Sequence, residues 1–286
     1  MGDVLALARP SDLTLAISLA EEADRPRTWY GLAPSEPGPI RLIVVRGAGA
    51  ADTLMGGRLP PWGAGFALPG ARTIIIRADA GDPRQTLQHE LAHLALHRSV
   101  RGRVPLWFDE GYAAVASGEI DRLVALQLSV AVARGKVPTL DELDRGLRSA
   151  RATAEASYGL AASAVLFLAR GHPSGELRPL LERLGRGEPF DSAVLATTGR
   201  TVGRMEIAWQ RDVRRRYGWI VWLTAGGFWL LVALLVIAAA WLRRRRDRPR
   251  RAALDAGWVV LPDEDELSGE EPDRSPNRLD PGQGAP

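Results

Sequence analysis

The sequence predicts an α+β domain, in which a small sheet precedes a helical part, and one transmembrane helix near the C-terminus. Two apolar runs of strand length, 40–45 and 73–76, come early in the chain. From Pro83 onward, apolar residues recur at helical spacing. Residues 219–242 then carry no charge, and a helix of that length can cross a bilayer with some tilt.

The spacing of apolar residues also predicts where the individual elements lie. Proline and glycine crowd the segment between the two apolar runs, which predicts a loop there, with an edge strand as the alternative. The helices expected from periodicity cover residues 11–24, 84–98, 106–116, 119–134, 157–170, 176–185 and 203–217.

Composition narrows the class of protein. The 46% of apolar residues and 25% of charged residues are ordinary for a globular domain with a core. The excess of basic residues is almost wholly arginine, and no basic stripe with interleaved aromatics occurs, so we do not expect nucleic-acid binding. The chain has no cysteine, which excludes disulfides, thiolate metal ligands and cysteine nucleophiles.

The pattern HELAH, over residues 89–93, points to metal chemistry. On a helix, His89 and His93 are four residues apart and share a face, so both imidazoles can bind one ion. Glu90 can reach a water at that ion and act as its general base. Two imidazoles and a carboxylate with one open position suit zinc, and Glu110, which opens the next predicted helix, can supply the carboxylate.

HELAH followed by WFDEGYA, over 107–113, resembles the gluzincin metallopeptidases, and within them the peptidase MA-like domain family. The resemblance implies a thermolysin-like domain with a small antiparallel sheet whose edge strand precedes the zinc helix and pairs with substrate. It implies zinc as the cofactor, His89, His93 and Glu110 as its ligands, and Glu90 as the base. Metzincins differ, because their pattern needs glycine and histidine where this chain has Leu96 and Ser99.

Four further residues are candidates for supporting roles. Tyr158 is our candidate donor to the tetrahedral oxyanion, because related zinc aminopeptidases carry a tyrosine downstream of the glutamate ligand; the alternative is packing at a helix start. Tyr112 is a weaker candidate for the same role. Asp109 either orients a ligand histidine or caps its own helix, and we favour the cap. His97 is too far along its helix to join the same ion, so we expect it to support the site or to pack.

These elements predict three parts: a peptidase domain over 1–217, a transmembrane helix over 218–242, and a disordered tail over 243–286. Four arginines follow the span directly, at 243–246, which favours a cytoplasmic tail and an extracytoplasmic peptidase domain. Residues 1–12 do not read as a secretory signal, which argues the other way.

The functional hypothesis is a membrane-anchored zinc peptidase that acts on peptides or proteins. No acidic motif precedes the zinc helix to hold a substrate ammonium group, so we favour an endopeptidase over an aminopeptidase. The alternative is a non-catalytic membrane protein that keeps the fold for binding.

Overall fold

In the computed structural model the chain divides into two compact units, residues 1–227 and 228–286. The structure describes residues 3–34, 38–54, 56, 63–119, 137–149, 151–222 and 228–257.

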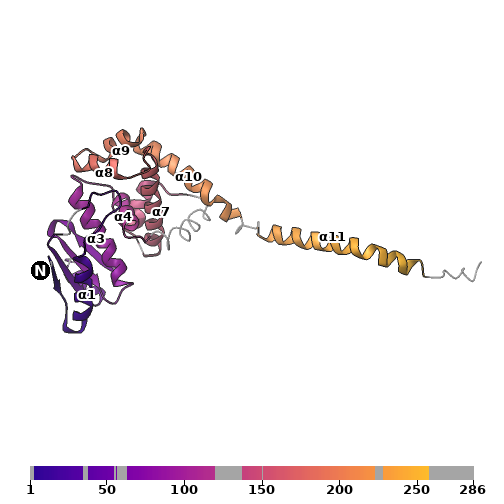
Figure 1. Ribbon diagram of the computed structural model, residues 1–286, viewed down its shortest axis with the longest axis horizontal. Helices are drawn as coiled ribbons and strands as arrows, with labels where there is room; N and C mark the ends of the chain where they lie inside the picture. Colours follow the sequence, from indigo (N-terminus) through magenta and orange to yellow (C-terminus); the bar gives the residue numbers. More distant parts are fainter. Residues whose placement is uncertain are drawn as a thin grey trace, which may run out of the picture. The chain divides into compact units, whose positions relative to one another are not determined.

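The first unit begins with a four-stranded mixed sheet (Figure 1). Strand β1 covers Val4–Leu7, β2 covers Ile40–Val45, β3 covers Gly65–Leu68 and β4 covers Thr73–Arg77. Their order across the sheet is β1-β2-β4-β3, so β3 is an edge strand. The apolar runs in β2 and β4 are confirmed as strands, and the segment before β4 contributes an edge strand as well as a loop.

The prediction of an antiparallel sheet is correct only at this edge. β3 runs antiparallel to β4, whereas β2 is parallel to both β1 and β4. The connections explain the difference. Only the 3₁₀ turn η2, Pro69–Ala71, separates β3 from β4, but α1, Leu13–Ala23, lies between β1 and β2 and allows the chain to return in the same direction.

Helix α3, Pro83–Ser99, carries the HELAH pattern and lies between two hydrophobic cores. Asp82 caps its N-terminus by accepting from the amides of Arg84 and Gln85, and Pro83 occupies the first turn, where no amide is needed. On one side Leu87 packs with the sheet and α1. On the other side Leu96 packs with the helical part. The site helix is therefore held from both sides.

The helical part continues around α4, Leu106–Ala116, and α7, Arg151–Arg170. These two helices approach each other closely at Gly111, where a Cβ would lie 2.5 Å from the carbonyl oxygen of Ala161. The remaining described helices of this unit are α2, Ala48–Leu54, α6, Leu140–Leu147, α8, Arg178–Gly185, α9, Phe190–Thr198, and α10, Val202–Trp222.

Most helix predictions are confirmed within a few residues, and 106–116 agrees at both ends. Sequence periodicity missed β1, α2, α6 and α9, all of them shorter than ten residues. The helix predicted over 119–134 falls almost wholly on 120–136, outside the described residues.

Two helices, rather than one, contain parts of the segment 218–242 that was predicted to cross a membrane. α10 ends at Trp222, α11 runs from Phe228 to Asp255, and 223–227 lie outside the described residues. No helix in the described part of the chain combines the length and apolarity that a bilayer crossing requires. The single transmembrane helix thus finds no support among these residues.

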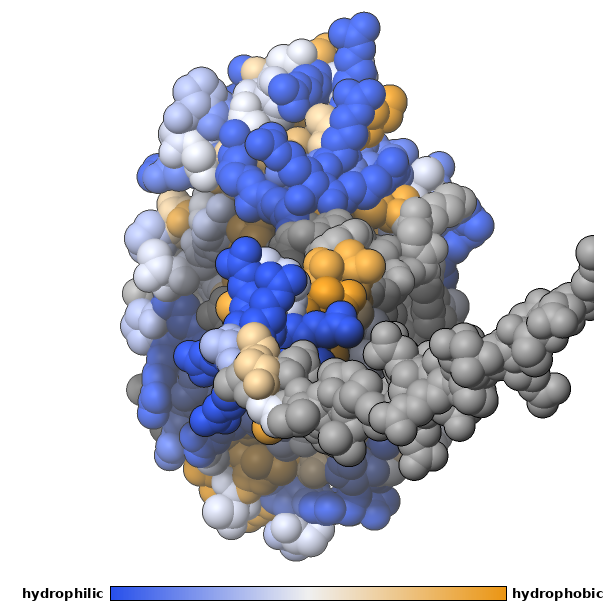
Figure 2. All heavy atoms as spheres, turned by 90° about the vertical axis from the view of Figure 1, so that its right-hand side faces the viewer, coloured by the Kyte–Doolittle hydropathy of each residue, from blue (hydrophilic) through white to orange (hydrophobic). Residues whose placement is uncertain are grey.

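Helix α11 also corrects the start of the predicted disordered tail. Residues 243–255 are helical, in keeping with the good helix propensity of arginine, alanine and leucine, whereas 258–286 lie outside the described residues. Large apolar side chains of α11 are exposed before its arginine-rich half, among them Trp229, Leu235 and Ile237. On the face drawn in Figure 2, by contrast, hydrophilic residues cover most of the coloured surface and apolar residues form separate patches.

Replacing Gly111 by alanine is expected to destabilise the protein by about 1–3 kcal/mol, because the new methyl group would overlap the backbone of α7. Urea unfolding followed by circular dichroism measures the change. Gly203→Ala is the matched control, since nothing lies within 4 Å of a Cβ there, and it should change stability by no more than about 1 kcal/mol. Equal unfolding midpoints for the two variants would contradict the close packing of α4 on α7.

Candidate metal centre

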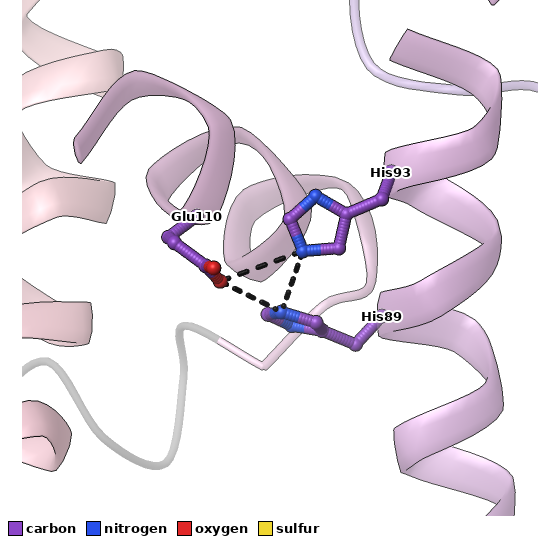
Figure 3. Close-up of side chains that lie close together, drawn as sticks. All are labelled: His89, His93 and Glu110. Carbon is purple, nitrogen blue, oxygen red and sulfur yellow. Dashed lines mark hydrogen bonds and ion pairs between the residues drawn. The ribbon is translucent and has the colours of Figure 1, made fainter. Parts of the chain in front are cut away.

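Three side chains from two helices converge on one point (Figure 3). His89 and His93 project from successive turns of α3, and Glu110 projects from α4. The two Nε2 atoms lie 3.2 Å apart, and Glu110 Oε2 lies 3.4 Å from each of them. The structure thus brings together the three residues predicted as ligands.

These spacings fit a tetrahedral zinc ion. Zinc–nitrogen and zinc–oxygen bonds of about 2.0–2.1 Å place neighbouring corners of a tetrahedron about 3.3 Å apart. The three donor atoms lie at 3.2 and 3.4 Å, and two imidazoles with a carboxylate are a donor set that zinc accepts while keeping a fourth position open.

The outer ring nitrogens of both histidines are held by carboxylates. His93 Nδ1 lies 2.7 Å from Asp109 Oδ1, and His89 Nδ1 lies 3.1 Å from Glu119 Oε2. An Nδ1–H that donates to a carboxylate fixes the tautomer whose Nε2 lone pair faces the ligand point, and it fixes the ring orientation. Asp109 therefore orients His93, one of the predicted ligands.

Asp109 also binds His97, through its second oxygen, at 2.7 Å. Our preference for a helix cap was wrong, because the N-cap residue of α4 is Pro105 and Asp144 accepts from the Trp107 amide instead. The expectation that His97 supports the site is confirmed. His93, His97 and Asp109 also meet the spacing for a metal, but contacts of 2.7 Å are hydrogen-bond lengths and are too short for two ligands of one tetrahedral ion.

Burial and the neighbouring charged groups shift the pKa values of the predicted ligands in opposite directions. Burial alone would lower the pKa of His89, but hydrogen bonds to Glu110 and Glu119 outweigh it and raise that pKa to about 9. Burial alone would raise the pKa of Glu110, but the charge of His93 and the hydrogen bond to His89 lower it to about 2. The protein thus holds a buried carboxylate in its charged form where a cation would bind.

Glu90 lies in a different environment. It is 6% exposed, and burial raises its pKa above the ordinary value, against the pull of His93 and His89. The backbone amide of Ala67, on edge strand β3, is close enough to hydrogen-bond to it. A Cβ on Gly65 would lie 2.9 Å from Glu90 Oε1, so the side chain packs directly against β3. Burial thus shifts the pKa of Glu90 in the direction opposite to that of Glu110.

The two tyrosines differ in what they can offer the centre. The ring of Tyr158, on α7, stands edge-on to His89 with centroids 6.0 Å apart. Burial, then the charges of Glu110 and Glu90, raise the pKa of Tyr158, so its hydroxyl keeps its proton. Tyr112 instead donates to the Tyr30 carbonyl at 3.1 Å, which removes it as a candidate donor to substrate.

Sequence reasoning missed one member of the site, Glu119. Glu119 follows α4 in a turn, thirty positions after His89, and no periodicity links the two.

A comparison with known protein families shows to which of them this chain is related. The profile of the Peptidase MA superfamily matches residues 37–215, which is more than half of the chain. The chain belongs to the peptidase MA superfamily. The match covers β2 to α10 and includes every residue of the centre described above. None of the curated proteins compared with the chain matches it significantly.

Membership agrees with the predicted gluzincin resemblance and identifies the chain as belonging to a superfamily of peptidases. The donor set supplied by His89, His93 and Glu110 fits the metal on which such peptidases usually depend.

Zinc binding is expected to release protons at neutral pH. The pKa of His89 is about 9 without metal, so its ring is protonated at pH 7, and zinc requires the neutral imidazole. Because this pKa is raised, the charged ring stabilises the metal-free fold most fully below about pH 6.5, and that contribution fades as the pH rises through about 9. Zinc affinity should rise by about tenfold per pH unit for each proton released.

Calorimetric titration of the metal-free chain with zinc at pH 7, in buffers of different ionisation enthalpy, counts the protons. We expect at least one. Equal heats in all buffers, together with an affinity that does not change from pH 6 to pH 8, would show that His89 is neutral and that its carboxylate contacts are not formed.

Proposed function

We propose that this chain is a zinc-dependent metallopeptidase that cleaves internal peptide bonds of protein or peptide substrates. The observation that carries the proposal is the convergence of His89, His93 and Glu110 at tetrahedral spacing, with the buried carboxylate of Glu90 next to them. A peptide is the expected substrate class because the family is one of peptidases.

His89, His93 and Glu110 would hold the zinc. When bound, zinc would supply a Lewis acid that polarises the scissile carbonyl and makes water more acidic. Glu90 accepts a proton from the attacking water at its carboxylate and then delivers it to the departing amine. Its raised pKa suits both halves of this transfer, since a base closer to neutrality can return the proton it has taken.

Tyr158 is the proposed donor to the oxyanion. Its hydroxyl keeps its proton, because burial and the neighbouring carboxylates of Glu110, Glu90 and Glu119 raise its pKa. A neutral donor near a low-dielectric centre can hydrogen-bond to the oxygen on which charge develops. The edge-on position against His89 supports this role over simple packing at a helix start, because α7 begins at Arg151, seven residues earlier.

The edge strand β3 is the proposed track for the substrate backbone. β3 ends the strand order of the sheet, and its residues Gly65 and Ala67 lie against Glu90. An extended peptide can add to such an edge through main-chain hydrogen bonds, and this would place its backbone next to the base.

The carboxylates around the centre support an endopeptidase. An aminopeptidase needs a carboxylate that is available to the substrate's ammonium group. Asp109 is occupied by His93 and His97, Glu119 is occupied by His89, and Glu110 faces both ligand rings. These three side chains therefore already have partners within the centre.

Membrane attachment is the second part of the proposal. It is supported by the uncharged sequence over 219–242 and by the exposed apolar side chains of α11. Exposed apolar surface of this kind marks a contact with lipid or protein. The arginines over 243–246 would then face the cytoplasm, and the peptidase domain would lie outside it.

Replacement of Glu90 by glutamine tests the chemistry directly. We expect hydrolysis of an unstructured protein such as casein to fall by about 10²–10⁴-fold, because the base is lost, with the zinc content unchanged. Glu110→Ala should instead lower the zinc affinity, because a ligand is lost. Glu182→Gln is the matched control, since that carboxylate is exposed and pairs with Arg178, away from the centre. Wild-type cleavage by the Glu90 variant would refute the mechanism. A folded wild-type chain that binds zinc and cleaves nothing would favour the non-catalytic alternative.

Membrane attachment is tested by fractionation. The full chain should remain with membranes after an alkaline carbonate wash, and Leu231→Arg combined with Leu235→Arg should release it, because charges are costly in the hydrocarbon layer. Leu195→Arg is the control, since Leu195 is also exposed but lies on α9. Recovery of the unaltered chain in the soluble fraction would argue against an anchor.

A further inference from the structure

Helix α11 changes character along its length rather than from one face to another. Its first fifteen residues, 228–242, carry no charge. The next nine residues, 243–251, contain seven arginines and one carboxylate, that of Asp247. We call these nine residues the arginine segment. The change from apolar to cationic side chains thus falls at one point of the helix, between Leu242 and Arg243.

Both parts of α11 surround the helix axis. Successive residues of an α-helix are turned by about 100°, so an uncharged run of this length covers every face. By the same rule, the four consecutive arginines at 243–246 point to four different sides. A groove on a protein or on a nucleic acid contacts one face of a helix and leaves the other faces unexplained. A layered partner, apolar first and anionic next along the axis, accounts for all of them.

The side chains of both parts are available to such a partner. Trp229, Leu235 and Ile237 are more than half exposed, and all seven arginines are exposed. Among the described residues, no carboxylate forms an ion pair with an arginine of this segment. The segment therefore presents a dense positive charge that attracts anions from outside.

A tryptophan marks the boundary between the two parts. Trp241 is half exposed, and the guanidinium carbon of Arg245 lies 4.0 Å from the centroid of its ring. Tryptophan prefers the interfacial region of a membrane, because its ring is apolar and its N–H is polar. Arginine can lay its stem on apolar surface while its head reaches the polar layer. The pair thus suits the depth at which hydrocarbon gives way to headgroups.

The dimensions of α11 match this layering. Fifteen helical residues extend about 22 Å, and half of a hydrocarbon core of about 30 Å is about 15 Å. The apolar part is therefore long enough to pass through one leaflet. The arginine segment would then begin at the headgroups of that leaflet.

We propose that the arginine segment binds anionic phospholipid headgroups at a membrane surface. The inference rests on the proposed membrane attachment of α11 and adds the lipid class, a phosphodiester lipid with a net negative charge. Guanidinium groups bind phosphate oxygens through paired hydrogen bonds, and a basic segment next to an apolar helix gains affinity from each charge. Zwitterionic lipids offer little of this attraction, because their headgroups carry no net charge.

Flotation of the full chain with two kinds of vesicle tests the proposal. Neutral vesicles consist of phosphatidylcholine, and anionic vesicles also contain phosphatidylglycerol. Each arginine near an anionic surface is worth about fivefold in binding, so the chain should partition into the anionic vesicles at least about 100-fold more strongly. About 1 M sodium chloride shortens the Debye length to about 3 Å and should remove most of this preference.

The test variant replaces the four consecutive arginines by glutamine: Arg243→Gln, Arg244→Gln, Arg245→Gln and Arg246→Gln. It should partition into anionic vesicles at least about tenfold less strongly, with partition into neutral vesicles unchanged. The matched control removes the same charge from exposed arginines of the first unit: Arg101→Gln, Arg103→Gln, Arg145→Gln and Arg148→Gln. It should alter either partition less than about threefold. Glutamine and arginine have similar helix propensities, so the helix should persist, which circular dichroism checks.

Equal partition into anionic and neutral vesicles at low salt, or an undiminished anionic preference of the folded test variant, would overturn the proposal. Tighter binding of the same segment to a random DNA duplex than to the anionic vesicles would also overturn it. Partition into neutral vesicles reports on the apolar anchor by itself, so a failure of the anchor and a failure of the arginine segment are told apart. Peptide hydrolysis enters neither measurement. The comparison of the two vesicles on the unaltered chain decides the matter even if the test variant does not fold.

Discussion

Glu110 meets the two histidines because α4 packs tightly against α7 while its other side contacts α3. The two helices are so close at Gly111 that no side chain fits there. This close packing fixes the position and orientation of the neighbouring residue, Glu110. α3 is held in turn by two cores, one with the sheet and one with the helical part. A ligand set drawn from two helices requires this rigidity, since an error of about 1 Å in position can cost about 10²-fold in rate.

The electrostatics of the centre follow from the same packing. The centre contains more carboxylates than the two histidine rings need as hydrogen-bond acceptors. Three of them, Glu90, Asp109 and Glu110, are largely removed from solvent. Buried anions are costly unless a cation balances them. Glu110 is held ionised beside the rings, whereas Glu90, set against β3, has a raised pKa. Their surroundings thus shift the pKa values of these two carboxylates in opposite directions, which supports the ligand role proposed for Glu110 and the base role proposed for Glu90.

Helix α3 has different surroundings on two of its faces. The face that carries His89 and His93 looks toward α4, whereas Leu91 and Leu94 line a separate pocket of about 390 Å³. His97 belongs to both surroundings through its bond to Asp109.

The sequence by itself determined the parts of the site that are local. His89, Glu90 and His93 lie within two turns of one helix, so their relative positions follow from helical geometry alone. Glu110 could be added because a recognisable motif surrounds it. Only the tertiary structure decided that Glu119 and Asp109 orient the rings and that β1 and β2 are parallel. These contacts join residues far apart in the chain, and no spacing rule predicts them, because packing between elements, rather than the geometry of any one element, sets which side chains touch.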